Sequence, residues 1–127
     1  MVGEQSIESY RDLRVWQESM TLAEQCYLLT REFPRSEMFS LVSQIRRAAA
    51  SVPANVAEGH GRESTGSFIQ SLRIAQGSLK ELQTHLLLSQ RVGIAGGSAL
   101  DATLARSDHV GRMLRSLIRS LQSRDPG

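Results

Sequence analysis

Apolar residues recur along most of this chain at alternating spacings of three and four, the pattern of helices that bury one face in a bundle. The pattern predicts four helices, over about residues 11–32, 37–60, 65–91 and 98–123. No run of alternating Val, Ile, Thr or Tyr indicates a strand. Because the connections are short, consecutive helices should run antiparallel. The sequence therefore predicts one all-α domain over residues 1–127, an antiparallel up-and-down four-helix bundle.

Each predicted helix carries one main line of apolar residues that should face the bundle axis. In chain order these lines are Leu13, Trp16, Met20, Ala23 and Tyr27; Met38, Leu41, Ile45, Ala48 and Val52; Phe68, Leu72, Ala75, Leu79, Leu82 and Leu86; and Leu100, Leu104, Leu114, Leu117 and Leu121. A second line on the first helix, Val15, Leu22 and Leu29, runs beside its main line. One line suffices in a simple bundle, so the second line predicts an oligomer interface. The alternative is a wide core face on the first helix.

Residues 44–62, QIRRAAASVPANVAEGHGR, stand out because a proline lies inside a predicted helix. An interior proline removes a backbone hydrogen bond and costs about 3 kcal/mol. Small residues around Pro53 would let another helix pack close to the kink. Asn55 takes the next position of the buried line, where a polar residue often fixes register and oligomer state. Glu58 could accept hydrogen bonds from an arginine, and Gly59 should help to end the helix.

Composition narrows the class of protein. The chain is 40% hydrophobic and 5% aromatic, which is enough for a core built mainly of aliphatic residues. Fourteen of the fifteen basic residues are arginine, which suits phosphate and carboxylate groups, although a bias toward arginine codons is the favoured explanation. The single cysteine, Cys26, excludes an intrachain disulfide and is expected to be buried. Since no leader-like or bilayer-length apolar run occurs, we expect a cytoplasmic protein without a membrane partner.

The fourth predicted helix carries the clearest basic stripe. Arg112, Arg115 and Arg119 are spaced three and four apart and should share one face, opposite the buried leucines. Arg106 and Arg124 extend the charge, and residues 102–124 hold five arginines and one aspartate. The stripe predicts contacts to nucleic-acid phosphates. The alternative is a solvated helix face.

Two further arginines, Arg46 and Arg47, lie in the proline-containing helix. Either could contact the phosphates of a nucleic acid. The favoured interpretation is an ion pair with Glu58, with an acidic residue of the first helix, or across a subunit interface.

The residue types needed for catalysis do not gather at useful spacings. Glu81 and His85 share a helix face, but the Glu-x-x-His pairs and extra glutamates of bundle metal sites are missing. No Gly-x-Ser-x-Gly elbow or glycine-rich phosphate loop occurs. We therefore expect no catalytic residue, no metal site and no cofactor, and a protein that is not an enzyme.

Five segments of the chain form a distinctive set: VWQ at 15–17, FPRSE at 33–37, QIRRAA at 44–49, VPANVAEGHGR at 52–62 and IAQGSLKEL at 74–82. Together they resemble a bacterial family of small four-helix proteins encoded in intervening sequences of 23S rRNA genes. The resemblance is clear over residues 11–94 and looser in the fourth helix. It marks Trp16, Pro53, Asn55, Glu58 and Gly59 as structural signature residues.

The resemblance implies a left-handed bundle that assembles into a ring, commonly a homopentamer, without catalytic activity. One branch of the family contains the accessory variability protein of diversity-generating retroelements, which forms a basic barrel that binds nucleic acid and a reverse transcriptase. The sequence thus leads to two hypotheses. The first is a non-enzymatic homo-oligomeric scaffold that binds RNA or DNA weakly and without sequence preference. The second is a protein-interaction module that docks a partner such as a reverse transcriptase through apolar surface.

Overall fold

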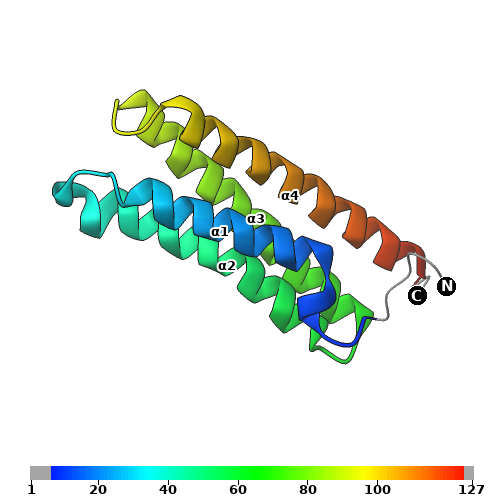
Figure 1. The fold of residues 1–127 in the computed structure, drawn as a ribbon. Coiled ribbons are helices and arrows are strands. Elements are labelled where there is room, and N and C mark those ends of the chain that lie inside the picture. The colour runs from blue at the N-terminus through cyan, green and yellow to red at the C-terminus, as the bar shows by residue number, and fades with distance from the viewer. Residues whose placement is uncertain (1–6, 125–127) are drawn as a thin grey trace.

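The structure, a computed structural model, describes residues 7–124, and all regular structure in this range is helical. Four long helices, α1 (Arg14–Thr30), α2 (Ser43–His60), α3 (Thr65–Arg91) and α4 (Gly97–Arg124), lie side by side (Figure 1). α1 packs against α2 and α4, and α3 packs against the same two helices. Each helix runs antiparallel to its neighbours in the chain, which confirms the predicted up-and-down four-helix bundle.

Short helical elements modify two of the predicted boundaries. The 3-10 helix η1 (Tyr10–Asp12) is separated from α1 by Leu13, whose backbone is extended. α1 therefore begins three residues later than predicted, at Arg14 and not at Arg11. A second 3-10 helix, η2 (Arg35–Glu37), and a π-helix, η3 (Met38–Val42), lead directly into α2. The second helix therefore starts where predicted but has a wider first turn. Gly93 and Gly97 adopt positive φ angles of 78° and 77°, which explains the turn between α3 and α4.

The core lines of α3 and α4 agree with the sequence pattern. The buried side chains of these helices include Leu72, Ala75, Leu79, Leu82 and Leu86 from α3 and Leu100, Leu114 and Leu121 from α4. Phe68, Leu104 and Leu117 are partly buried against the same core. The spacing was the better guide in α3, where five of the seven buried residues are leucine or alanine. The buried line of α4 also takes in residues that the predicted line did not include: Thr103, Ser107, Val110 and Ile118.

The buried face of α1 differs from the predicted one. Val15 and Leu22 are 4% and 0% exposed, so they belong to the core of this chain and are not available to another subunit. Their assignment to an oligomer interface is wrong, and the alternative of a wide core face fits. Leu29 is partly buried against the same core. By contrast, Met20 and Tyr27 from the predicted main line are 37% and 44% exposed.

Buried hydroxyl groups explain this error. Ser19 and Thr30 are buried on the core face of α1, together with Cys26. The hydroxyl of Ser19 donates to the Val15 carbonyl at 2.6 Å, and that of Thr30 donates to the Cys26 carbonyl at 2.8 Å. Because each hydroxyl is satisfied within its own helix, these polar residues enter the core at low cost. A pattern read from apolar residues alone places the core face of α1 too far round the helix.

The proline-containing segment of α2 packs against α3. Pro53 is buried within α2, and the core line continues through Val56 to Gly59. Asn55 was predicted on that line but is only half-buried, and its Nδ2 donates to the Ser51 carbonyl at 2.8 Å. The Ser51 and Ser78 hydroxyls, 2.8 Å apart, link α2 to α3. Asn55 thus hydrogen-bonds within α2 next to the proline, and the contact from this segment to α3 is made by Ser51.

Candidate nucleic-acid interface and apolar groove

The three central arginines of the predicted stripe lie on the outer side of α4. Arg112, Arg115 and Arg119 are all exposed. Within residues 7–124, none of them forms an ion pair with a carboxylate. Their guanidinium groups therefore face solvent, with donors available to an external anion.

Arg106, which was predicted to extend the stripe, points toward α1 instead. Its Nη1 donates to the two carboxylate oxygens of Glu18 at 2.9 and 3.2 Å, and its Nε donates to Gln25 Oε1 at 2.8 Å. His109 Nε2 lies 3.6 Å from the same Glu18 carboxylate. We name Glu18, Gln25 and Arg106 the α1/α4 clasp. Because the guanidinium is occupied in this clasp, Arg106 is removed from the candidate interface.

The arginines of α2 also have partners within the chain. Arg46 Cζ lies 4.6 Å from the centroid of the Tyr27 ring, and Arg46 Nε donates to Thr30 Oγ1 at 2.9 Å. Arg47 is exposed and donates to Gln44 Oε1 at 3.1 Å. The predicted ion pair of either arginine with Glu58 is wrong, because Glu58 pairs with Arg62, which lies just beyond the end of α2. Arg46 therefore fixes α2 to α1, through a cation–π contact and a hydroxyl rather than a carboxylate.

A shallow groove runs between α3 and α4 beside the exposed arginines. Two hollows of about 300 and 310 Å³ make up this α3/α4 groove. They share Leu79, Lys80, Gly111 and Arg115 as lining residues, so they are continuous. Arg112 lines one of them, and Gln76 lines the other. The groove brings Lys80, the one lysine of the chain, next to the arginines of α4.

Hydrogen bonds fix the register of the two walls of this groove. Gln83 Nε2 donates to Ser107 Oγ at 2.9 Å and to Asp108 Oδ1 at 3.0 Å. Since α3 and α4 are antiparallel, this register puts Lys80 level with Arg112 and places Arg73 near the level of Arg119. Arg73 and Lys80 are both exposed. Sequence reasoning missed this second basic wall, because helical spacing within α4 carries no information about its register with α3.

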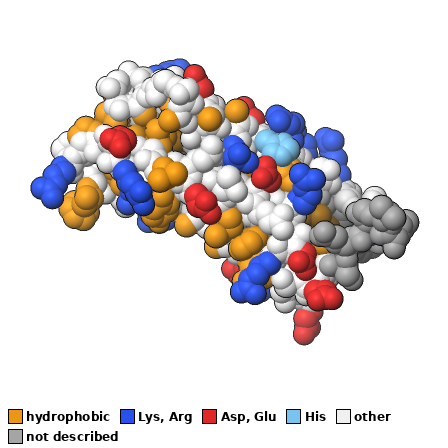
Figure 2. Space-filling view, in the orientation of Figure 1, with side chains coloured by type: hydrophobic (Ala, Val, Ile, Leu, Met, Phe, Trp, Pro, Cys, Tyr) orange, Lys and Arg blue, Asp and Glu red, His pale blue; other side chains and the backbone are white. Residues whose placement is uncertain are grey.

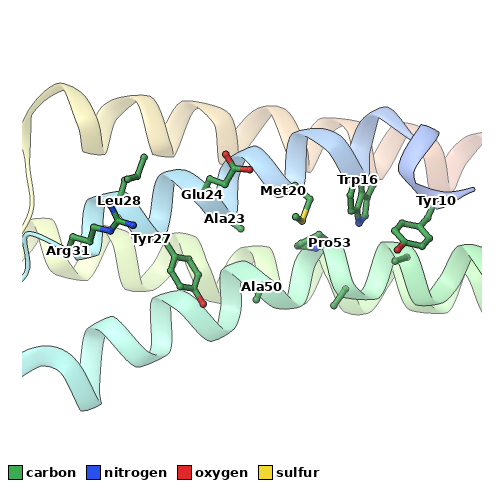
Figure 3. Close-up of a pocket in the computed structure, with 12 residues that line it drawn as sticks. Tyr10, Trp16, Met20, Ala23, Glu24, Tyr27, Leu28, Arg31, Ala50 and Pro53 are labelled. Carbon is green, nitrogen blue, oxygen red and sulfur yellow. The ribbon is translucent and has the colours of Figure 1, made fainter.

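A larger groove of about 610 Å³ lies between α1 and α2. This α1/α2 groove is lined by Tyr10, Trp16, Met20, Ala23, Glu24, Tyr27, Leu28, Arg31, Ala50, Pro53, Ala54 and Ala57. In Figure 3 the side chains of Trp16, Met20 and Tyr27 project from α1 toward the face of α2 that carries Ala50 and Pro53. Hydrophobic side chains gather between charged ones on the face of the bundle seen in Figure 2. The apolar residues that the sequence pattern placed in the core of α1 therefore line an open groove.

The remaining chemical groups do not suggest catalysis. Cys26 is fully buried, and burial raises the pKa of its thiol to about 12, so the reactive thiolate is strongly disfavoured. Within residues 7–124, no three His, Cys, Asp or Glu side chains come together as metal ligands. Among the helices that the structure describes, none combines the length and apolar character needed to cross a membrane.

Comparisons with known proteins agree with the fold and the sequence motifs. A crystal structure of a protein of unknown function from the S23 ribosomal protein family of Bacteroides thetaiotaomicron superposes with a TM-score of 0.76. The two chains are 24% identical, and the alignment covers 83% of this chain and 95% of that one, so the likeness supports the shared fold alone. A search of curated proteins finds no match. The sequence model of the 23S rRNA-intervening sequence protein family matches residues 11–116, and the chain therefore belongs to that family.

Proposed function

We propose that this protein is a non-enzymatic homo-oligomeric scaffold that binds RNA or DNA without sequence preference. The observation that carries the proposal is that some arginines are hydrogen-bonded within the chain while others are exposed and have no carboxylate partner in residues 7–124. Arg46 and Arg106 are bound within the chain, whereas Arg112, Arg115 and Arg119 share one exposed face without a carboxylate partner in residues 7–124. Solvent-facing guanidinium groups in a row suit the regularly spaced phosphates of a nucleic acid.

The apolar α1/α2 groove supports self-assembly. Tyr27 and Leu28 are 44% and 57% exposed, and the small side chains of Ala50 and Ala54 would let a helix approach closely. Exposed apolar surface of this kind marks interaction sites. A ring, which the family resemblance suggests as a pentamer, would repeat the basic face of α4 on every subunit and sum its electrostatic field.

Charge reversal of the stripe tests the nucleic-acid part. Binding of fluorescent RNA and DNA would be measured by anisotropy over a salt series for the protein and for the variant Arg112→Glu, Arg115→Glu, Arg119→Glu. We expect the variant to lose salt-sensitive binding and to keep its helicity by circular dichroism, because these residues are exposed. Each lost phosphate contact lowers the salt slope by roughly 0.7–0.9.

A matched control carries the same change in net charge elsewhere: Arg14→Glu, Arg35→Glu, Arg91→Glu. These three residues are exposed and lie outside the α3/α4 groove. If the control loses binding as completely as the stripe variant, net charge rather than the stripe is responsible. If the stripe variant binds as tightly as the unchanged protein, the proposal fails.

Native mass spectrometry tests the assembly part. A species of five times the 14.0 kDa chain mass is the expected result. Met20→Glu combined with Tyr27→Glu places two carboxylates in the α1/α2 groove, and we expect this variant to dissociate while retaining its helices. A monomer for the unchanged protein would contradict the proposed assembly.

A second candidate function is docking of a protein partner, such as the reverse transcriptase of a diversity-generating retroelement. The α1/α2 groove also favours this possibility, because apolar grooves between helices accept an amphipathic helix from a partner. A reverse-transcriptase gene beside this one would identify the partner to test. Binding to that enzyme should then resist salt and be lost in the Met20→Glu, Tyr27→Glu variant.

A further inference from the structure

We infer that the α3/α4 groove holds one single strand of nucleic acid by its phosphates, and that α3 supplies the second wall through Arg73 and Lys80. The inference rests on the proposed nucleic-acid binding. It adds a site, a second set of contacting residues and a preference for strand form. None of these follows from the stripe on α4 alone.

The first support is the distribution of charge around the groove. Arg112 and Arg115 of α4 and Lys80 of α3 line the hollows. Arg119 and Arg73 line neither hollow, and the register places them near one level further along the two helices, where both are exposed. No ion pair within residues 7–124 involves any of these five cations. Cations on both sides of a groove can contact the phosphates of one strand from two directions and so fix its position. A stripe on one side can contact them from one direction only.

The single carboxylate at the groove marks one end of the basic surface. Asp108 lines the hollow next to Arg112, and its Oδ1 accepts the hydrogen bond from Gln83 Nε2. Beyond it, toward the start of α4, Arg106 is held in the α1/α4 clasp. The strand should therefore run from the level of Lys80 toward that of Arg73 and Arg119.

The shape of the site distinguishes a single strand from a duplex. An α-helix with its side chains is about 10–12 Å across, and packed helix axes lie about 8–10 Å apart. The major groove of B-DNA, about 12 Å wide, admits one helix and not a pair. A duplex is a rigid convex body and should therefore meet fewer of these cations at once than a flexible single strand does. A single strand can lie between the walls and reach Lys80 and Arg115, which line the groove itself.

Glycines leave the groove open. A Cβ on Gly77 would have no atom within 4 Å, so helix packing does not require glycine there. A Cβ on Gly111 would lie 3.3 Å from Leu79 Cδ2. Glycine inside a helix costs about 1 kcal/mol relative to alanine, and at Gly77 no neighbour in the described structure offsets that cost. The sugar-phosphate backbone of a bound strand would occupy the space that a side chain at position 77 would otherwise fill.

The lining of the groove also accounts for a lack of base preference. Proteins that hold single strands through their bases use aromatic side chains as stacking platforms. The residues around the two hollows are aliphatic, basic, acidic, amide or glycine, with no aromatic among them. Contacts at this site therefore go to the phosphates, and affinity should depend on salt far more than on base identity.

The test compares strand forms by fluorescence anisotropy. The probes are a labelled oligouridine of about 20 nucleotides, longer than the ~4–16 nucleotides of common single-strand sites, and a labelled DNA duplex of the same length. The variants are Arg73→Ala with Lys80→Ala, the matched control Arg35→Ala with Arg91→Ala, and Gly77→Gln, which fills the groove without changing charge. All of these positions are exposed, so the fold should be retained.

We expect the unchanged protein to bind the single strand more tightly than the duplex. The Arg73→Ala, Lys80→Ala variant should bind the single strand several-fold more weakly, with a salt slope lower by about 1.4 for two lost contacts. The control should match the unchanged protein. Gly77→Gln should weaken the single-strand complex more than the duplex complex.

Three results would overturn the inference. One is tighter binding of the duplex than of the single strand. Another is unchanged single-strand affinity in both the Arg73→Ala, Lys80→Ala and the Gly77→Gln variants while the α4 triple charge reversal abolishes binding, which leaves the proposed function standing. The last is failure of the unchanged protein to bind either probe, which removes both the inference and the nucleic-acid part of the proposed function.

Discussion

Gly59 of α2 lies so close to Ser71 of α3 that a Cβ on the glycine would be 2.6 Å from the serine Cβ. The same added atom would be 2.9 Å from Phe68 Cδ1. Among the glycines of the described residues, Gly59 permits the closest approach, which is between the C-terminal part of α2 and the N-terminal part of α3. Gly59 is therefore a packing residue inside α2, and Gly61 is the residue that follows its end.

Replacing Gly59 with alanine should destabilise the protein in spite of the better helix propensity of alanine. Helix propensity favours the change by about 1 kcal/mol, whereas overpacking of a tight contact costs about 1–3 kcal/mol, and here the backbone-linked Ser71 Cβ cannot move aside alone. We expect a net loss in the free energy of unfolding, measured by urea denaturation. Gly66→Ala is the matched control, since a Cβ there meets nothing within 4 Å, and equal effects of the two changes would contradict the prediction.

The α1/α4 clasp should contribute to stability without contributing to nucleic-acid binding. Arg106 and Glu18 side chains are 31% and 25% exposed, so their ion pair is partly shielded from solvent. We expect Arg106→Ala to lower the free energy of unfolding by about 1–2 kcal/mol, because it leaves Glu18 and Gln25 without their donor. A double-mutant cycle with Glu18→Gln should give a coupling energy of about 0.5–1.5 kcal/mol.

Arg112→Ala provides the contrast for the clasp. Arg112 is exposed and unpaired within residues 7–124, so its loss should change stability by less than about 0.5 kcal/mol and should weaken nucleic-acid binding. The reverse assignment, with Arg106 important for binding and Arg112 for stability, would show that the roles have been exchanged.

Pro53→Ala should raise the thermal stability of the isolated subunit. An interior proline costs about 3 kcal/mol. Its smaller entropy in the unfolded chain returns about 0.4–1 kcal/mol, and the packing of its buried ring returns about 1 kcal/mol more, so alanine should be favoured by about 1 kcal/mol. Differential scanning calorimetry gives the melting temperature, and native mass spectrometry gives the subunit number. Since Pro53 also lines the α1/α2 groove, a changed subunit number would assign the proline to assembly. A lower melting temperature would contradict the prediction, and would mean that packing of the proline side chain stabilises the fold by more than the lost hydrogen bond destabilises it.

The buried thiol of Cys26 should make stability depend on alkaline pH. Burial raises its pKa from 9.0 to about 12, so between these values the folded state binds more protons than the unfolded state. The thiol's contribution to the free energy of unfolding should then fall as pH rises through this window, by about 1.4 kcal/mol per pH unit and by about 4 kcal/mol over the whole window, and should be constant below it. Urea denaturation across the window checks this, with Cys26→Ala as the control whose slope lacks the thiol contribution. Parallel slopes for the two proteins would rule out the thiol as the cause.

How much of the molecule could be predicted from sequence depends on how its polar groups are satisfied. α3 was predicted well because five of its seven buried residues are leucine or alanine, so apolar spacing and burial largely coincide. α1 was not, because Ser19 and Thr30 satisfy their hydroxyls within the helix and enter the core, leaving Met20 and Tyr27 outside. A prediction from the spacing of apolar residues alone cannot detect that polar residues have replaced apolar ones in the core.

The candidate site shows the same limit between helices. The exposed stripe of Arg112, Arg115 and Arg119 followed from helical spacing alone. The role of Lys80 did not, because it depends on the register that Gln83 sets between α3 and α4. Arg106 was misassigned for a related reason: its partner Glu18 lies 88 residues away in the chain, and only the packing of α4 on α1 brings them together.

The order of the helices around the bundle places the α1/α2 and α3/α4 grooves on opposite sides. An occupant of one groove therefore does not block the other, and the two sites share no lining residue. Their binding free energies should be nearly additive. Under the two proposals, one subunit would serve as an adaptor, with a protein bound on one side of the bundle and a nucleic-acid strand on the other.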